Sequence, residues 1–173
     1  MFQMKITGIV EAGLFIKNKW PTKIVSIVDP EQQQISLGQH HIILKMHDVE
    51  TETSNSIVIP EKQHIEQILE FTKFLTDKDK LLVHCNMGVS RSTAVSCGIL
   101  IQHGMTFEDA YNYVKTIRNV ARPNRKIIKY IDDIFALNGK FLNFINEKRN
   151  PSNVIPLSEI AKYYANKKHF EFV

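Results

Sequence analysis

Residues 84–92 constrain the fold of this chain more than any other segment. They read His-Cys-Asn-Met-Gly-Val-Ser-Arg-Ser and follow the apolar run at residues 81–83, and a helical pattern begins at Arg91. A strand, a tight loop and a helix N-terminus are therefore expected in close succession. Such a loop turns backbone N–H groups inward, and the helix dipole adds partial positive charge. The segment predicts a binding site for a tetrahedral oxyanion.

Two side chains of this loop favour phosphoryl transfer through a cysteine. The positive field that attracts an oxyanion also stabilises a thiolate at Cys85, which is the nucleophilic form of the side chain. Arg91 can hold two anion oxygens with its planar guanidinium. A buried structural cysteine beside a solvated arginine is the alternative interpretation. The preceding strand, the turn-permitting Gly88 and the following helix all favour the catalytic one.

The loop resembles the signature loop of cysteine-dependent protein tyrosine phosphatases, and residues 88–92 resemble that of the dual-specificity branch. A second similarity to this branch lies at Arg118 and at residues 121–124, Ala-Arg-Pro-Asn. A looser one lies at residues 23–30, Lys-Ile-Val-Ser-Ile-Val-Asp-Pro, which are similar to an early core strand of compact members. The resemblance covers residues 1–137. It implies a cysteine-phosphatase-like fold and hydrolysis of phosphotyrosine and phosphoserine/threonine in proteins through a phosphocysteine intermediate.

The resemblance also implies roles for the residues of the loop. Cys85 would attack phosphorus, and Ser92 would hydrogen-bond the sulfur as it leaves the phosphoenzyme, although a serine there also suits a helix N-cap. His84 would support the loop and help to keep Cys85 ionised. The phosphoryl group would be bound by Asn86, Met87, Gly88, Val89, Ser90 and Arg91. No metal or cofactor is expected, because Arg91 and the loop amides supply the positive charge.

A phosphatase of this kind needs a general acid on a loop upstream of the nucleophile. Asp48 directly follows a predicted strand and lies 37 residues before Cys85, which is close to the separation usual in the family. Glu50 and Glu52 remain alternatives. Asp29 also follows a predicted strand, but we interpret it as a turn residue before Pro30.

The remaining pattern predicts an α/β fold with a small central, mostly parallel sheet flanked by helices. The chain of 173 residues, 43% hydrophobic and 23% charged, fits one domain. We expect residues 1–150 to form the catalytic domain and residues 151–173 a C-terminal extension with a short helix packed on it. Strands are expected near residues 4–7, 23–28, 40–46 and 81–84, with a short helical turn after the first. Helices are expected at about residues 60–75, 91–104, 106–117 and 127–135. Pro60 suits the first helical position, Thr106 an N-cap, Gly139 a helix stop or kink, and Cys97 the core.

Charge and cysteine content limit the partners. The net charge is +4, and residues 115–129 hold six basic side chains and no acidic one. This run is a solvated face or a positive field that attracts phosphorylated proteins. Binding of nucleic acid is a third alternative, although no recognition module or basic stripe with interleaved aromatic residues supports it. An RNA 5′-phosphatase, a phosphoinositide phosphatase and a phospho-binding module with little turnover remain alternatives, and no membrane association is expected. Two cysteines do not make a disulfide framework, and a thiolate needs a reducing compartment, so a cytoplasmic location is expected. Oligomeric state is left open.

Overall fold

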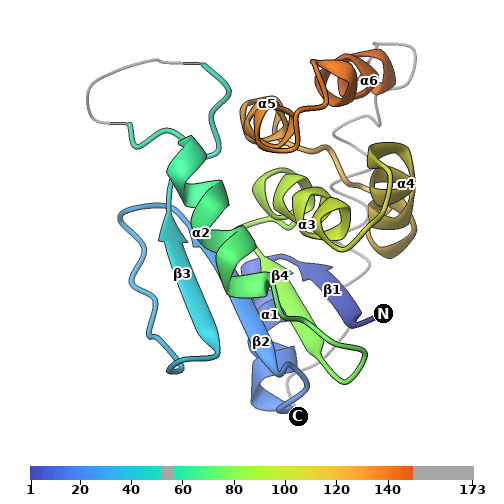
Figure 1. The fold of residues 1–173 in the computed structure, drawn as a ribbon. Coiled ribbons are helices and arrows are strands. Elements are labelled where there is room, and N and C mark those ends of the chain that lie inside the picture. Colours follow the sequence, from blue (N-terminus) through green and yellow to red (C-terminus); the bar gives the residue numbers. More distant parts are fainter. Residues whose placement is uncertain (52–56, 150–173) are drawn as a thin grey trace.

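A four-stranded sheet forms the centre of the molecule in the computed structural model, which describes residues 1–51 and 57–149. Its strands all run parallel in the order β1-β4-β2-β3 (Figure 1). They are β1 (Gln3–Thr7), β2 (Lys23–Val28), β3 (His41–Lys45) and β4 (Lys80–His84). The predicted α/β class with a parallel sheet is thereby confirmed. Because parallel strands end at the same edge of a sheet, the residues that follow them can meet there.

Helices cover both faces of the sheet. Helix α1 (Ile9–Lys17) packs on one face, where Ala12, Ile24 and Leu82 form a small second core. The other face carries the main core, including Val25, Val83 and side chains from the remaining helices. These are α2 (Lys62–Thr72), α3 (Arg91–Gln102), α4 (Phe107–Ile117), α5 (Arg125–Ile134) and α6 (Lys140–Lys148) (Figure 1).

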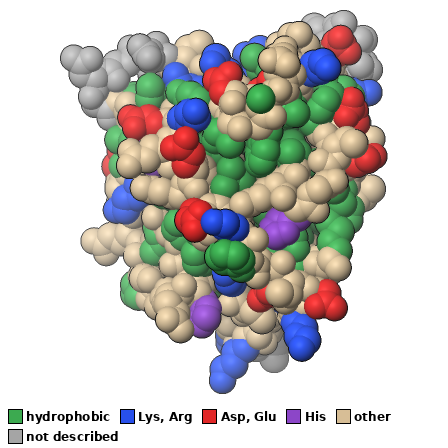
Figure 2. Space-filling view, in the orientation of Figure 1, with side chains coloured by type: hydrophobic (Ala, Val, Ile, Leu, Met, Phe, Trp, Pro, Cys, Tyr) green, Lys and Arg blue, Asp and Glu red, His purple; other side chains and the backbone are tan. Residues whose placement is uncertain are grey.

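The central helix α3 is surrounded by protein. All of its residues from Arg91 to Leu100 are buried. Cys97 is fully buried in it, as expected for a core residue, and burial raises the pKa of its thiol. In Figure 2 apolar side chains gather in the upper middle of the molecule, over the region where Figure 1 draws α3 and α5. The N-terminus of α3 is thus fixed by packing on every side, which keeps the loop before it in place.

Helix boundaries depart from the sequence pattern at three positions. The segment after β1 is a helix of nine residues rather than a short turn. Helix α2 begins at Lys62 with Glu61 as its N-cap, so Pro60 lies before the helix. Gly139, expected to end or kink a helix, is the N-cap of α6 with a φ of 78°. The predicted cap at Thr106 is confirmed, because its side chain accepts a hydrogen bond from the N–H of Asp109.

Two further expectations concern domain extent and membranes. The helix expected within residues 151–173 lies outside the described residues, so the domain boundary stays a prediction. In the described part of the chain, no helix combines the length and apolar character needed to cross a bilayer.

Candidate active site

The loop between β4 and α3 places the thiol of Cys85 among hydrogen-bond donors. Its Sγ lies 3.2 Å from the backbone nitrogen of Gly88, which donates to it, and 3.2 Å from Ser92 Oγ. Only 2% of Cys85 is exposed. Gly88 has a φ of +67°, and a Cβ there would lie 2.3 Å from the carbonyl carbon of Thr7. The turn therefore requires glycine both for its backbone conformation and for its close approach to β1.

Groups outside the loop hold its carbonyl oxygens. Arg118, which is 1% exposed, donates from Nε to Gly88 O at 3.0 Å and from Nη2 to Met87 O at 2.9 Å. Its Nη1 is paired with Glu11 at 3.0 Å. The backbone N–H of Ile9 donates to Asn86 O, and that of Arg122 to Val89 O.

This arrangement fixes the direction of the loop amides. In a trans peptide the C=O and N–H groups point in opposite directions. The carbonyls of residues 86–89 point outward to their donors, so the N–H groups of residues 87–90 point to the other, concave side. The loop is thereby arranged as an anion site, with Cys85 at its base.

Arg91 is held by one of its terminal nitrogens. Nη1 donates to Asp29 Oδ1 at 2.7 Å and also to the carbonyl oxygen of Met46. The Nε atom is buried and has no hydrogen-bond partner among the described residues. Asp29 accepts a second hydrogen bond from Asn86 Nδ2. One carboxylate thus ties the arginine to the loop and leaves the Nε edge of the guanidinium available for an anion.

Asp48, the residue predicted to be the general acid, lies beside the loop. Its Oδ1 accepts hydrogen bonds from Ser90 Oγ at 2.7 Å and from Asn124 Nδ2 at 2.9 Å. Its Oδ2 accepts no hydrogen bond from the described residues. Asn124 is also the N-cap of α5, because its Oδ1 accepts from the N–H of Ile127. The start of α5 therefore fixes the position of the carboxylate that follows β3.

Glu50 lies close by but in a different environment. It accepts from the backbone and Nε of Arg125, at 2.8 and 2.6 Å, and from Arg149 at 2.8 Å. Burial raises the pKa of Glu50, but the bonds from Arg125 and the charge of Arg149 outweigh burial and leave it below its usual value. Glu50 therefore forms ion pairs that link the segment after β3 to Arg125 of α5 and to Arg149 after α6. Glu52 lies outside the described residues.

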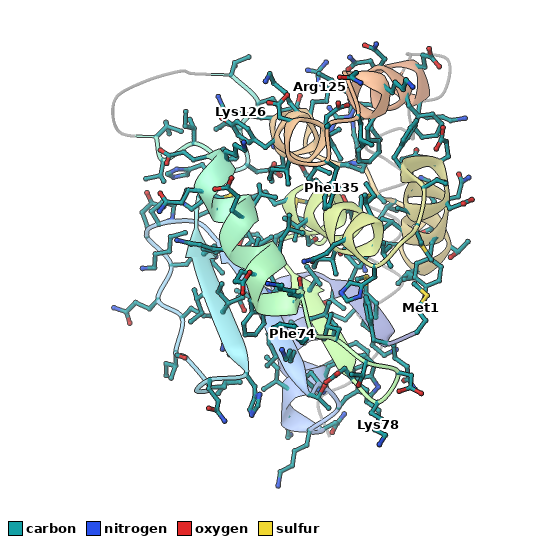
Figure 3. All side chains as sticks on the ribbon, in the orientation of Figure 1. Met1, Phe74, Lys78, Arg125, Lys126 and Phe135 are labelled. Atoms are coloured by element: carbon teal, nitrogen blue, oxygen red, sulfur yellow. The ribbon has the colours of Figure 1, made fainter. Side chains whose placement is uncertain are left out.

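The basic run at residues 115–129 is not one uniform face. Arg118 is buried behind the loop, and Arg125 is paired with Glu50. Lys129 pairs with Asp133. Arg125 and Lys126 lie at the upper end of the molecule, at the start of α5 (Figure 3). Part of the run thus builds the site, and the remainder is surface.

Sequence reasoning missed the role of Asp29. It does begin a turn, since its carbonyl accepts from the N–H of Gln32, but its carboxylate pairs with Arg91. The signal that could have shown this is its place directly after β2, next to β4 in the sheet. His84 was expected to support the loop, and it bonds Ser26 Oγ at 2.6 Å on the α1 side of the sheet.

The fold and the loop together define an α/β domain with an oxyanion site built around a cysteine. Residues 22–134 match the family model for the catalytic domain of dual-specificity phosphatases. This match covers more than half of the chain, so the chain belongs to the dual-specificity phosphatase family.

Relatives match over limited stretches. The mouse dual specificity protein phosphatase 14 is 35% identical over 80 residues, which are 43% of this chain and 38% of that protein. A probable rhodanese domain-containing dual specificity protein phosphatase of Dictyostelium discoideum is 33% identical over 73 residues, 41% of this chain and 15% of the relative. The human protein phosphatase Slingshot homolog 1 is 44% identical over 55 residues, 31% of this chain and 5% of the relative. The chain thus matches a minor part of each relative's length.

Solved structures share the fold over most of the chain. DUSP15 superposes with a TM-score of 0.60 at 19% identity, covering 87% of this chain and 94% of that structure. The phosphatase domain of Yvh1 from Chaetomium thermophilum gives a TM-score of 0.58 at 19% identity and covers 82% and 95%. At this identity the likeness concerns the fold alone.

Proposed function

We propose that this protein hydrolyses phosphate monoesters, foremost phosphotyrosine and phosphoserine/threonine in proteins, through a phosphocysteine intermediate. One observation carries the proposal. The Cys85 sulfur lies at the base of a loop whose N–H groups point inward and whose arginine has a buried Nε that no described residue pairs with. These donors complement the oxygens of a transferring phosphoryl group.

In the first step the Cys85 thiolate attacks phosphorus, and the bond from phosphorus to the ester oxygen breaks. The N–H groups of residues 87–90 and the Nε edge of Arg91 bind the equatorial oxygens. Asp48 donates its proton to the leaving oxygen. The alcohol or phenol departs, and the phosphoryl group is left on sulfur.

In the second step water attacks phosphorus while the Asp48 carboxylate accepts its proton. The bond between sulfur and phosphorus breaks, and inorganic phosphate leaves. Ser92 Oγ, at 3.2 Å from Sγ, stabilises the departing thiolate by a hydrogen bond. Thiolate and protonated acid are both restored, and no cofactor enters the cycle.

The surroundings of the two described carboxylates support Asp48 as the acid. Asp48 is exposed and has an oxygen with no recorded bond beside the loop. Glu50 is bound by two arginines, and its lowered pKa disfavours the protonated form that a general acid needs. Because a thiolate nucleophile requires a reducing compartment, the proposal includes a cytoplasmic location.

The test is a panel of substrates. Hydrolysis rates are measured on phosphotyrosine and phosphothreonine peptides, a phosphoinositide and a 5′-triphosphorylated RNA, with Cys85→Ser as the control. We expect turnover on the phosphopeptides and none with the variant. Preferential turnover of the RNA or the phosphoinositide would reassign the substrate, and binding without turnover would leave a phospho-binding module.

A further inference from the structure

A row of buried polar side chains crosses the α1 face of the sheet. Ser26 Oγ lies 2.7 Å from His41 Nε2 and 2.6 Å from His84 Nε2. His41 belongs to β3, Ser26 to β2 and His84 to β4, and β2 lies between the other two strands. Ser26 and His84 are partners in the parallel register, so they share one face, while the next residue, Cys85, belongs to the main core on the other.

The donors in this row can be ordered from the geometry. The backbone N–H of Leu37 donates to His41 Nδ1 at 3.1 Å, so the proton of a neutral His41 is on Nε2. His41 Nε2–H therefore donates to Ser26 Oγ. The hydroxyl proton of Ser26 then points to His84 Nε2, which accepts it. A neutral His84 consequently carries its proton on Nδ1.

Burial disfavours the charged form of both rings. It lowers the pKa of His41, and it lowers that of His84 to about 4, with the nearby His41 acting in the same direction. Contact with the backbone of Cys85 opposes this shift. Ser26 occupies Nε2, and the buried Nδ1 has no hydrogen-bond partner among the described residues.

We propose that Ser26 and His41 are positioning residues, which hold His84 in its Nδ1–H tautomer and so keep this buried N–H directly behind the nucleophile. The proposal rests on the function proposed above. The positive end of the Nδ1–H dipole then faces Cys85 from behind and adds to the field of the loop amides. Without Ser26, His84 Nε2 would lose its donor, and the ring could turn or change tautomer.

A spectroscopic test reads the tautomer directly. In ¹⁵N-labelled protein, the nitrogen shifts of His84 distinguish a proton on Nδ1 from one on Nε2. We expect Nδ1–H in the wild type at pH 7 and a mixture of the two tautomers in Ser26→Ala. A proton on Nε2 in the wild type would overturn the proposal.

A chemical test measures the reactivity of the Cys85 thiol. Alkylation of Cys85 by iodoacetate at pH 6 is expected to be about 3- to 10-fold slower in Ser26→Ala, with the difference closing at higher pH, as a shift of up to about one pH unit implies. Ser26→Thr keeps the hydroxyl and should restore the rate. His41→Leu should behave as Ser26→Ala does.

Matched controls separate positioning from simple loss of packing. Ser96→Ala removes another buried serine hydroxyl from α3, one without a hydrogen-bond partner in the described part of the chain. His40→Leu alters the exposed histidine next to His41. Neither should change the pH profile of alkylation. Five other charged groups adjoin the loop, and none of the variants replaces them: Asp29, Arg91, Asp48, Arg118 and Glu11.

The outcomes distinguish the two proposals. If Ser26→Ala alters alkylation no more than Ser96→Ala does, the positioning role is wrong. If the tautomer and alkylation results come out as expected but the wild type hydrolyses no phosphate ester, the proposed function fails and the positioning of Cys85 stands.

Discussion

Two aspartates that follow neighbouring strands have different surroundings at the site. Asp29, after β2, is paired with Arg91 at 2.7 Å and also binds Asn86. Asp48, after β3, is exposed, and it accepts hydrogen bonds from two uncharged side chains, Ser90 and Asn124. Asp29 is thereby tied to a cation and to the loop, whereas the partners of Asp48 are uncharged side chains. The same residue type thus fixes an arginine in one place and is, in the proposed mechanism, the proton donor in the other.

Replacing Asp48 by asparagine should slow the alkyl phosphate reaction most. A phosphoserine substrate has a poor leaving group that needs protonation, so kcat should fall about 10²–10⁴-fold. An activated aryl phosphate should lose far less. Glu50→Gln, measured on the same two substrates, serves as the comparison and should not discriminate between them. Equal losses on both substrates with Asp48→Asn would contradict the assignment.

Replacing Asp29 by asparagine should weaken anion binding. The amide cannot pair with the Arg91 charge, so the guanidinium loses its fixed orientation, and we expect KM and the inhibition constant for vanadate to rise about tenfold, equivalent to about 1.4 kcal/mol. Steady-state kinetics with vanadate competition give both values. Asp133→Asn, on the surface of α5, should leave them unchanged. An unaltered vanadate constant for Asp29→Asn would show that the turn alone matters.

At the scale of elements, the loop depends on a residue far from it in the sequence. Arg118 follows α4 directly, yet its guanidinium binds two loop carbonyls and Glu11 of α1. It therefore connects α1, the loop and the segment before α5. Arg122 supports the loop differently, through its backbone N–H, with its side chain exposed.

Arg118→Lys should destabilise the fold and the anion site together. A lysine cannot serve three acceptors in the planar geometry of the guanidinium, so buried acceptors lose their donors, and we expect a loss of about 2–4 kcal/mol in the free energy of unfolding. Urea unfolding with and without vanadate measures both effects. The matched change Arg122→Lys should cost less than about 0.5 kcal/mol. Similar losses in the two variants would refute the bracing role of Arg118.

The sequence predicted elements with a clear period and residues with a clear motif. The strands, the α3 helix and the loop from Cys85 to Ser92 belong to this group. Helix α1 was underestimated because its own apolar residues are spread around its whole circumference, so its sequence shows little helical periodicity. The contact of Asp29 with Arg91 and the row through Ser26 depend on which strand lies beside which. That order is a tertiary property, which no local pattern in this chain contains.

At the scale of the whole molecule, the buried histidines set a lower limit to the pH of stability. The unfolded chain binds a proton at His84 near pH 6.5, whereas the folded protein binds it only near pH 4. Stability is therefore present above about pH 6.5 and is lost as the pH falls toward 4. His41, whose pKa is also lowered, acts in the same direction.

Urea unfolding at pH 7 and pH 5 tests this effect. From the shift at His84 alone we expect the free energy of unfolding to fall by about 2 kcal/mol between the two values. In His84→Gln, which carries no titrating ring, the fall should be smaller by about that amount. An unchanged pH dependence in the variant would show that other groups control the acid limit.

The strand order also determines when the protein can become active during its synthesis. β1 and β2 are not neighbours, because β4 lies between them. When residues 1–60 have left the ribosome, β1, β2 and β3 have been released, with a gap between β1 and β2 where β4 belongs. Only when β4 enters the gap do the Cys85 loop and the aspartate after β2 meet. Long-range parallel pairing of this kind is slow to form, so we expect the site around Cys85 to be completed among the last events of folding.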